Sequence, residues 1–153
     1  VNEMVEALAQ SLGRKSYTIK EKAFVVSREE KQAVEKKADY TNLLLKWREL
    51  DMALIALQNY PSSPDEATEM RFGDVLHRQH AVGSFLSYFY NVHGDIISGE
   101  QDFTCRMSLA DLRHCRTVYG IGYGAQQDSI IGALRTGLFT HILLTEEQAK
   151  KAI

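Results

Sequence analysis

The sequence predicts an α/β domain with a mostly parallel sheet, helices on both faces and a small β-hairpin insertion. Helix-like and strand-like hydrophobic periods alternate along the chain, and one short apolar run is typical of a parallel strand. A strand, a glycine-rich loop, a helix and a second strand then follow one another in the last third. The 153 residues suit one compact domain, so we expect residues 1–153 to form a single domain.

The first third of the chain is predicted to be mainly helical. Apolar residues recur three and four positions apart from Val1 to Leu12, and Gly13 then ends the helix. An extended segment follows at residues 16–27, then a solvated charged helix at 28–37 and an amphipathic helix at 41–50.

The middle of the chain supplies the first strand and the hairpin. Residues 51–57 form a continuous apolar run after Asp51, as expected of a central parallel strand that is covered on both faces. Glycine near asparagine supplies the positive φ of a hairpin turn. The elements predicted here are a proline-containing loop at 58–65, a weak helix at 64–80 interrupted by Gly73, a strand at 82–90, a turn at 91–94 and a returning strand at 95–98.

The last third has the most regular pattern. Ser108 and Asp111 form a capping-box-like pair that begins a helix, and Thr145 with Gln148 caps the final one. Between them lie a strand at 118–121, the glycine loop at 120–126, a helix at 125–136 ended by Gly137, and a strand at 138–144. This order predicts a βαβ crossover.

Composition excludes several classes of protein. The chain has 18 basic and 20 acidic residues and a net charge of −2, so it lacks the positive surplus of a DNA-binding domain. Two cysteines, Cys105 and Cys115, favour reduced thiols in a cytoplasmic protein. No apolar run approaches the ~20 residues of a membrane span, and there is no secretory signal, so we expect no membrane partner. The absence of an initiator methionine suggests an excised domain or fragment.

The glycine loop is the best local signal for a ligand. Its glycines allow close approach of the backbone, and the following helix N-terminus offers unpaired N–H groups and a partial positive charge. Gly120, Gly122 and Ala125 also satisfy G-x-G-x-x-A, with Glu146 where a ribose-binding acid would lie. That dinucleotide hypothesis is weak because one strand and one helix follow, and a tight turn without ligand is another alternative.

Other constellations carry less information. His77 and His80 stand three residues apart but form no Glu-x-x-His or H-E-x-x-H motif and have no Cys nearby, and Ser84 and Cys105 have no recognisable catalytic partners. Aromatic residues between Phe85 and Tyr90 fit a core better than a sugar-stacking surface. We therefore predict no catalytic residue, no metal and no cofactor.

From the glycine loop onward the sequence resembles a known family. Residues 129–149, SIIGALRTGLFTHILLTEEQA, are similar to the C-terminal end of SorC-type sugar-binding bacterial transcriptional regulators, which typically follow the pattern ILxALRGGLxNxLxTDExTA. Four other segments resemble the family in order and spacing, at residues 8–13, 51–57, 81–94 and 107–112. The resemblance covers most of the chain.

The resemblance implies a non-catalytic effector domain. Its fold is expected to be Rossmann-like, similar to the ribose-phosphate isomerase, glucosamine-phosphate deaminase and CoA-transferase group. In full-length members a helix-turn-helix domain binds operator DNA, and a bound sugar or sugar phosphate changes oligomerisation or DNA affinity. The resemblance also implies that this chain lacks the helix-turn-helix domain and the first strand–helix units of the effector domain.

The partners that the resemblance implies are a sugar, polyol or sugar phosphate, operator DNA through the absent domain alone, and further copies in a dimer or tetramer. The alternative is an isomerase-like or deaminase-like enzyme of the same fold group. That reading lacks a base–acid pair, because Asp102 alone is not a mechanism.

Departures from the family pattern bear on the ligand. The family's phosphate-binding Lys corresponds to Gln126, an Arg corresponds to Phe103, and an Asp of the hairpin corresponds to Ser84. Each lost cation removes charge-assisted hydrogen bonds worth ~1.5–3 kcal/mol, which favours a neutral sugar or polyol. The candidate ligand-binding residues are Gln58, Asn59, Ser84, Gln101, Asp102, Phe103, Gly122, Tyr123, Gly124, Ala125 and Gln126.

Overall fold

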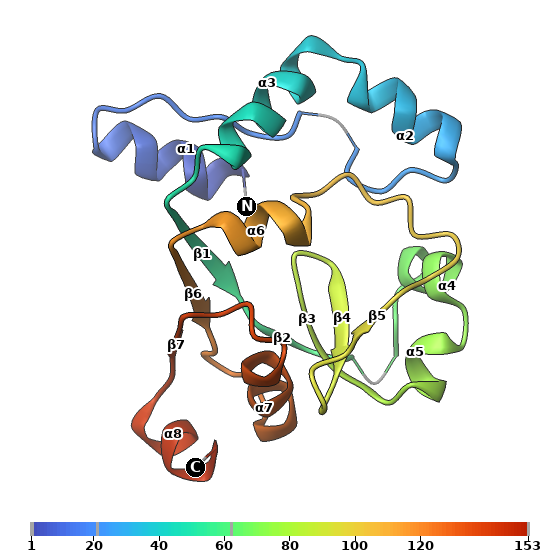
Figure 1. Cartoon of the computed structure of the whole chain (residues 1–153), viewed down its shortest axis with the longest axis vertical. Helices are drawn as coiled ribbons and strands as arrows, with labels where there is room; N and C mark the ends of the chain where they lie inside the picture. Colours follow the sequence, from blue (N-terminus) through green and yellow to red (C-terminus); the bar gives the residue numbers. More distant parts are fainter. Residues whose placement is uncertain (1, 21, 62, 153) are drawn as a thin grey trace. The chain divides into compact units, whose positions relative to one another are not determined.

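The computed structural model describes residues 2–20, 22–61 and 63–152. The predicted helix start at Val1 lies outside the described residues. The chain divides into two compact units, an N-terminal unit of Val1–Glu49 with Phe103–Cys105, and a C-terminal unit of Leu50–Asp102 with Arg106–Ile153. Figure 1 shows the helices and strands of both.

The N-terminal unit is helical, as predicted. Its helices are α1 (Asn2–Ser11), α2 (Arg28–Glu35) and α3 (Ala38–Arg48). Gly13 follows α1 with φ +61°, and the Ser27 side chain caps α2 by accepting a hydrogen bond from the Glu30 N–H. Val25, Val34, Tyr40 and Cys105 form the buried cluster of this unit. The described part of residues 16–27 contains no strand, which agrees with an extended connection.

The C-terminal unit contains a three-stranded parallel sheet in the order β1-β6-β7. Its strands are β1 (Met52–Ala56), β6 (Thr117–Ile121) and β7 (His141–Leu143), and the helices of this region are α6 (Leu109–His114), α7 (Gln127–Arg135) and α8 (Glu146–Ala152). Helix α7 connects β6 to the parallel strand β7, so the predicted βαβ unit is confirmed. The predicted α/β class is confirmed with it.

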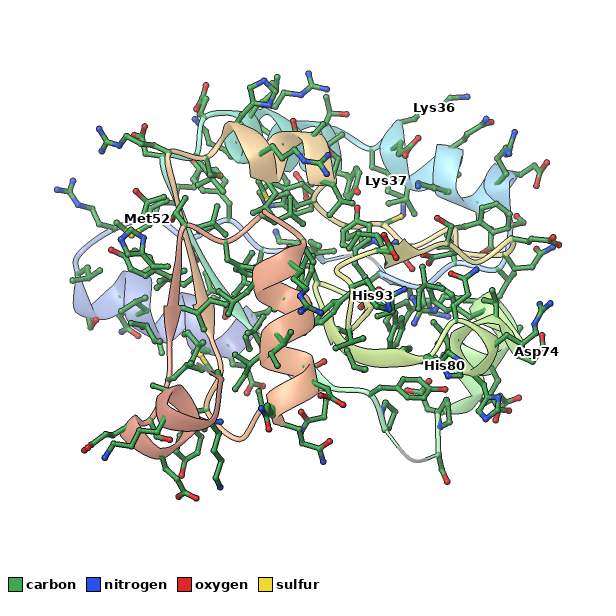
Figure 2. All side chains as sticks on the ribbon, turned by 60° about the horizontal axis from the view of Figure 1, so that its bottom comes forward. Lys36, Lys37, Met52, Asp74, His80 and His93 are labelled. Atoms are coloured by element: carbon green, nitrogen blue, oxygen red, sulfur yellow. The ribbon has the colours of Figure 1, made fainter. Side chains whose placement is uncertain are left out.

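Strand β1 differs from the expectation of a central strand covered on both faces. It lies at an edge of the sheet, paired with β6. Ile55 points to the buried side, whereas Met52 and Leu54 are 54% and 62% exposed. Met52 is labelled on this strand in Figure 2. The prediction was wrong in this detail because a continuous apolar run does not distinguish a central strand from an edge strand.

A four-stranded antiparallel sheet forms the other half of the C-terminal unit, in the order β2-β3-β4-β5. Its strands are β2 (Gln58–Asn59), β3 (Ala81–Phe85), β4 (Tyr88–Asn91) and β5 (Ile96–Ile97), accompanied by the short helices α4 (Glu66–Phe72) and α5 (Val75–Arg78). The hairpin insertion is thus present. Gly73 separates α4 from α5, as predicted.

The single strand predicted at 82–90 is wrong, because the chain reverses within it. Leu86 and Ser87 adopt φ +47° and +62° and form the tight turn between β3 and β4. Both residues carry a Cβ, so neither supplies the glycine or asparagine signal by which such turns are recognised in a sequence.

Helix α7 packs closely against the antiparallel sheet. The buried Tyr90 hydroxyl on β4 donates a hydrogen bond to the Ser129 carbonyl on α7 at 3.0 Å. A Cβ at Gly132 of the same helix would lie 2.6 Å from the Asn91 carbonyl oxygen. The absence of a side chain at Gly132 therefore sets how near the helix comes to the strand.

Candidate functional site

The carboxyl ends of the three parallel strands meet at one edge of their sheet. Strand β1 leads there into Gln58 and Asn59, and β6 leads into the glycine loop and the N-terminus of α7. Strand β7 leads into Thr145, which precedes α8. Ligands of open α/β sheets bind at this edge, so its side chains form the candidate site.

Asn59 joins β2 to the glycine loop through both ends of its amide. Its Nδ2 donates to the Gly124 carbonyl at 3.0 Å, and its Oδ1 accepts from the Gln126 N–H at 2.7 Å. Gly124 has φ +78°, a conformation that side chains rarely adopt. The structure therefore brings together Asn59, Gly124 and Gln126, three of the predicted residues.

Gln58 and Ser84 lie beside this contact. They are register partners in the antiparallel sheet, and the Ser84 Oγ donates to the Gln58 Oε1 at 3.5 Å. The Ser129 Oγ on α7 donates to the Gln58 carbonyl at 3.2 Å. Ser84 is buried and Gln58 is exposed. Gln58 precedes Asn59 on β2, and Ser84 on β3 pairs with Gln58. Two more predicted residues therefore lie beside the contact between Asn59 and the loop.

The remaining loop residues have contrasting exposures. Gly122 and Ala125 are buried, and Tyr123 is 82% exposed. The Ala125 N–H donates to the Gly122 carbonyl at 2.9 Å, which closes a turn through Gly124. Gln126 is the N-cap residue of α7, and its exposed side chain makes no capping hydrogen bond.

Gln148, on α8, is a site residue that we did not predict from the sequence. Its Nε2 donates to the carbonyl oxygens of Gly122 and Ala125, each at 2.8 Å. Its Oε1 accepts from the N–H and the hydroxyl of Thr145, each at 3.1 Å. The Thr-x-x-Gln spacing indicated the second pair of contacts, a helix cap, but gave no sign of the first.

Asp102 contacts two arginines. Its Oδ1 lies 3.4 Å from Arg71 Nη1, and its Oδ2 accepts from Arg106 Nη2 at 2.6 Å. The Arg71 and Asp102 side chains are 7% and 8% exposed. Burial lowers the pKa of the Arg71 guanidinium, and the charge of Asp102 opposes that effect. A buried charge requires such pairing, so these contacts give Asp102 a structural role.

Arg106 extends this charged group to the strained turn of the hairpin. Its Nη1 donates to the Ser87 carbonyl at 2.6 Å, and its guanidinium lies 3.6 Å from the centre of the Tyr88 ring. Arg71 and Arg106 together carry one positive charge more than the Asp102 carboxylate neutralises. Besides their contacts with Asp102, Arg71 Nε donates to the Ala67 carbonyl and Arg106 Nη1 donates to the Ser87 carbonyl.

Gln101 and Phe103 lie in other surroundings. Gln101 lines a cavity of about 400 Å³, whose wall includes Phe72, Ser98 and Asp74. Asp74, which lies between α4 and α5, is labelled in Figure 2. Phe103 belongs to the N-terminal unit, where it packs against the cluster that contains Tyr40. Within residues 2–20, 22–61 and 63–152, neither Gln101 nor Phe103 is hydrogen-bonded to the glycine loop.

Metal and membrane features are absent from the described part of the chain. Among residues 2–20, 22–61 and 63–152, no three His, Cys, Asp or Glu side chains converge as a metal-binding group. Within the same ranges no helix has the length and apolar character that crossing a bilayer requires.

Comparison with solved structures identifies the fold. The full-length sorbitol operon regulator SorC from Klebsiella pneumoniae matches with a TM-score of 0.82 and 21% identity, over 100% of this chain and 51% of that chain. A DeoR family transcriptional regulator from Listeria monocytogenes matches with a TM-score of 0.83 and 22% identity, over 99% of this chain and 64% of that one. A transcriptional regulator from Streptococcus pneumoniae matches with a TM-score of 0.83 and 17% identity, over 99% of this chain and 60% of that chain.

These solved regulators share the fold of this chain, and the chain spans about half to two thirds of their length. Among curated proteins, none matches the sequence. The family described as "Putative sugar-binding domain" matches residues 1–153. With the whole chain matched, and with the fold and carboxyl-edge loop described above, this protein belongs to that family of sugar-binding domains.

Proposed function

We propose that this chain is the effector-sensing domain of a cytoplasmic bacterial transcriptional regulator and that it binds a neutral sugar or polyol at the glycine loop. The observation that carries the proposal is the loop at the carboxyl edge of the parallel sheet, held by the Asn59 amide. Membership in the sugar-binding family supports a carbohydrate ligand. The solved structures of the same fold are described as transcriptional regulators, which supports a regulatory role.

The side chains around the loop favour an uncharged ligand. Asn59 and Gln148 hydrogen-bond to the loop through their amides, and Gln126 lies at the start of α7. The amide of Gln58 and the hydroxyl of Ser84 lie beside Asn59 in the antiparallel sheet. Amides and hydroxyls both donate and accept, as sugar hydroxyls do. A phosphate dianion would depend on backbone N–H groups at the start of α7, where the helix dipole contributes ~0.3–1 kcal/mol when exposed. Gln101, Asp102 and Phe103 stay predictions for further ligand contacts.

Partners follow from charge and family. With a net charge of −2, the chain is expected to leave operator binding to another domain of the regulator. In this proposal the sugar changes the dimer or tetramer in which that other domain meets DNA. The proposed domain has no catalytic role, so incubation with sugar phosphates should give no isomerised or deaminated product; measurable turnover would contradict the proposal.

A matched pair of ligands tests the site. Calorimetry with sorbitol and sorbitol 6-phosphate, and then with other polyol and ester pairs, should show that the free polyol binds at least as well as its ester. Gln126→Lys should shift the preference toward the ester, because a cation then stands at the start of α7. Gln79→Ala, an exposed change at the end of α5, should leave both affinities unchanged. A wild-type preference for the ester of tenfold, ~1.4 kcal/mol, would contradict the neutral-ligand proposal.

A further inference from the structure

The amide of Gln148 makes hydrogen bonds with both of its polar atoms, and they point to two different parts of the protein. The Nε2 donates to two loop carbonyls, those of Gly122 and Ala125, at 2.8 Å each. The Oε1 accepts from the N–H and hydroxyl of Thr145, at the start of α8. An amide offers two donors and two acceptor positions, so all four are used.

The loop depends on such contacts because it contains little regular structure. Its own turn bond runs from the Ala125 N–H to the Gly122 carbonyl. The Gly124 carbonyl is held by Asn59 from the β2 side, and the carbonyls on either side of Gly124 are held by Gln148 from the α8 side. Two amides, Asn59 and Gln148, thus fix the carbonyl directions of Gly122, Gly124 and Ala125 in the loop that carries the proposed ligand site.

Helix α8 lies against α7, and its Ala149 and Ala152 are half-buried. None of its described residues is buried. Its ion pairs, Lys150 with Glu146 and Lys151 with Glu147, lie within the helix and are largely exposed, so they contribute little to its position. One further hydrogen bond, from Gln127 Nε2 to the Lys151 carbonyl at 2.6 Å, connects it to α7.

We propose that Gln148 is a positioning residue that couples the glycine loop to α8, so that ligand binding at the loop and docking of α8 stabilise each other. The inference rests on the proposed function for the identity of the ligand site. Because coupling between two equilibria is reciprocal, a ligand that orders the loop also orders α8, and release of α8 weakens ligand binding. The docking of α8 then depends on whether the ligand site is occupied. Any part of the assembled regulator that contacts α8 is therefore affected by ligand binding.

Gln148→Glu separates the two roles of this residue. A glutamate at this position still accepts from Thr145, as in an ordinary capping box, but it places carboxylate oxygens against the loop carbonyls. Lys150→Gln is the matched control, since it changes the net charge of α8 by the same amount and Lys150 pairs with Glu146 within α8. Gln148→Ala, which loses both roles, provides a second variant without added charge.

Amide hydrogen exchange of the ligand-free chain gives the first test. Gln148→Glu should raise exchange at least fivefold in both residues 122–126 and residues 146–152, with β6 unchanged and with Lys150→Gln like wild type. Gln148→Ala should raise exchange in the same two segments. Wild-type exchange of the loop in both Gln148 variants would overturn the inference.

The second test adds sorbitol and the other polyols of the calorimetric series. In the wild type, a polyol that slows exchange in the loop should also slow it in α8, and Gln148→Glu should lower its affinity at least fivefold. A polyol that protects the loop but leaves α8 unchanged would overturn the coupling while the proposed function stands. If no sugar binds, the proposed function fails, whereas linked loop and α8 exchange in the ligand-free variants would still support Gln148 as their connection.

Discussion

The two sheets of the C-terminal unit are stabilised in different ways. The antiparallel sheet buries aromatic side chains: Phe85 is 1% exposed and lies within ring contact of Tyr88, Tyr90 and Phe139. The parallel sheet buries one face, and Leu54 and Leu143 on its other face are more than half exposed. The exposed face of the parallel sheet therefore adds little packing, and the glycine loop at the edge of this sheet is held by polar contacts.

The sharpest test of this contrast replaces one apolar side chain in each sheet. Phe85→Ala should lower the free energy of unfolding by about 3–5 kcal/mol, because a large ring is removed from a filled core. Leu54→Ala should change it by less than about 0.5 kcal/mol, since that side chain is 62% exposed. Urea denaturation of both variants gives the comparison, and equal losses would contradict it.

The junction between α7 and the antiparallel sheet gives the next largest effect. Gly132→Ala should destabilise the protein by about 1–3 kcal/mol, because the new Cβ would meet the Asn91 carbonyl and the Tyr90 ring. Helix propensity alone predicts the opposite sign, a gain of roughly 1 kcal/mol. Leu134→Ala, at an exposed position of the same helix, is the control for helix substitution. A stabilised Gly132→Ala protein in the same denaturation experiment would show that α7 packs more loosely.

The glycine loop allows a test in which packing plays no part. A Cβ at Gly124 would have no atom within 4 Å, so Gly124→Ala meets the strain of φ +78° alone, about 1–2 kcal/mol. Gly124→Asn should cost less, because asparagine tolerates the left-handed region better than other side chains. Thermal unfolding of the two variants measures the difference. Equal stability of alanine, asparagine and glycine at this position would mean that the loop adopts another conformation.

The smallest effect concerns the cap of α4, beside the antiparallel sheet. The Asp65 carboxylate accepts from the Thr68 N–H at 2.7 Å, and hydrogen bonds from the Thr68 side chain and from this N–H lower the pKa of Asp65. Asp65→Ala should cost about 1 kcal/mol. Since the folded-state pKa is lowered, the contribution is present above the unfolded-state pKa, roughly 3.9, and is lost as the pH falls through the folded-state value.

Urea denaturation at a series of pH values checks this sign. The difference between wild type and Asp65→Ala should stay constant from about pH 5 to 8 and shrink below about pH 4. Asp65→Asn, which keeps a capping oxygen without the titrating proton, should stay close to wild type above pH 5 and should not show the same loss in acid. A difference that grows in acid would contradict the assigned cause.

Local signals in the sequence predicted most of the elements, because their causes lie within a few residues. Ser108 caps α6 by accepting from the Asp111 N–H, and Gly13 follows α1 with positive φ. Apolar periodicity likewise placed β6, α7 and β7 near their observed positions. The glycine loop was indicated by its own sequence, Asn59 was among the candidate ligand-binding residues, and the structure places Asn59 in contact with the loop.

Features that depend on distant residues were not predictable in this way. The Leu86–Ser87 turn requires positive φ at two ordinary residues, which the fold imposes and the local sequence does not signal. The pairing of Asp102 with Arg71 joins positions far apart in the chain, as does the contact of Gln148 with Gly122. Periodicity carries no information about such partners.

The strand order also has a consequence for the route by which the protein folds. In the antiparallel sheet Phe85 pairs with Tyr88 across a tight turn, whereas in the parallel sheet Met52 pairs with Thr117, so the intervening chain includes the whole antiparallel sheet. Closing a long loop costs more entropy than closing a short one, and non-local pairing slows folding. We expect the hairpin to form first and shorten the effective distance that β1 must span to reach β6. The carboxyl edge then comes into existence late, so a nascent chain acquires its hairpin before it acquires a place for a ligand.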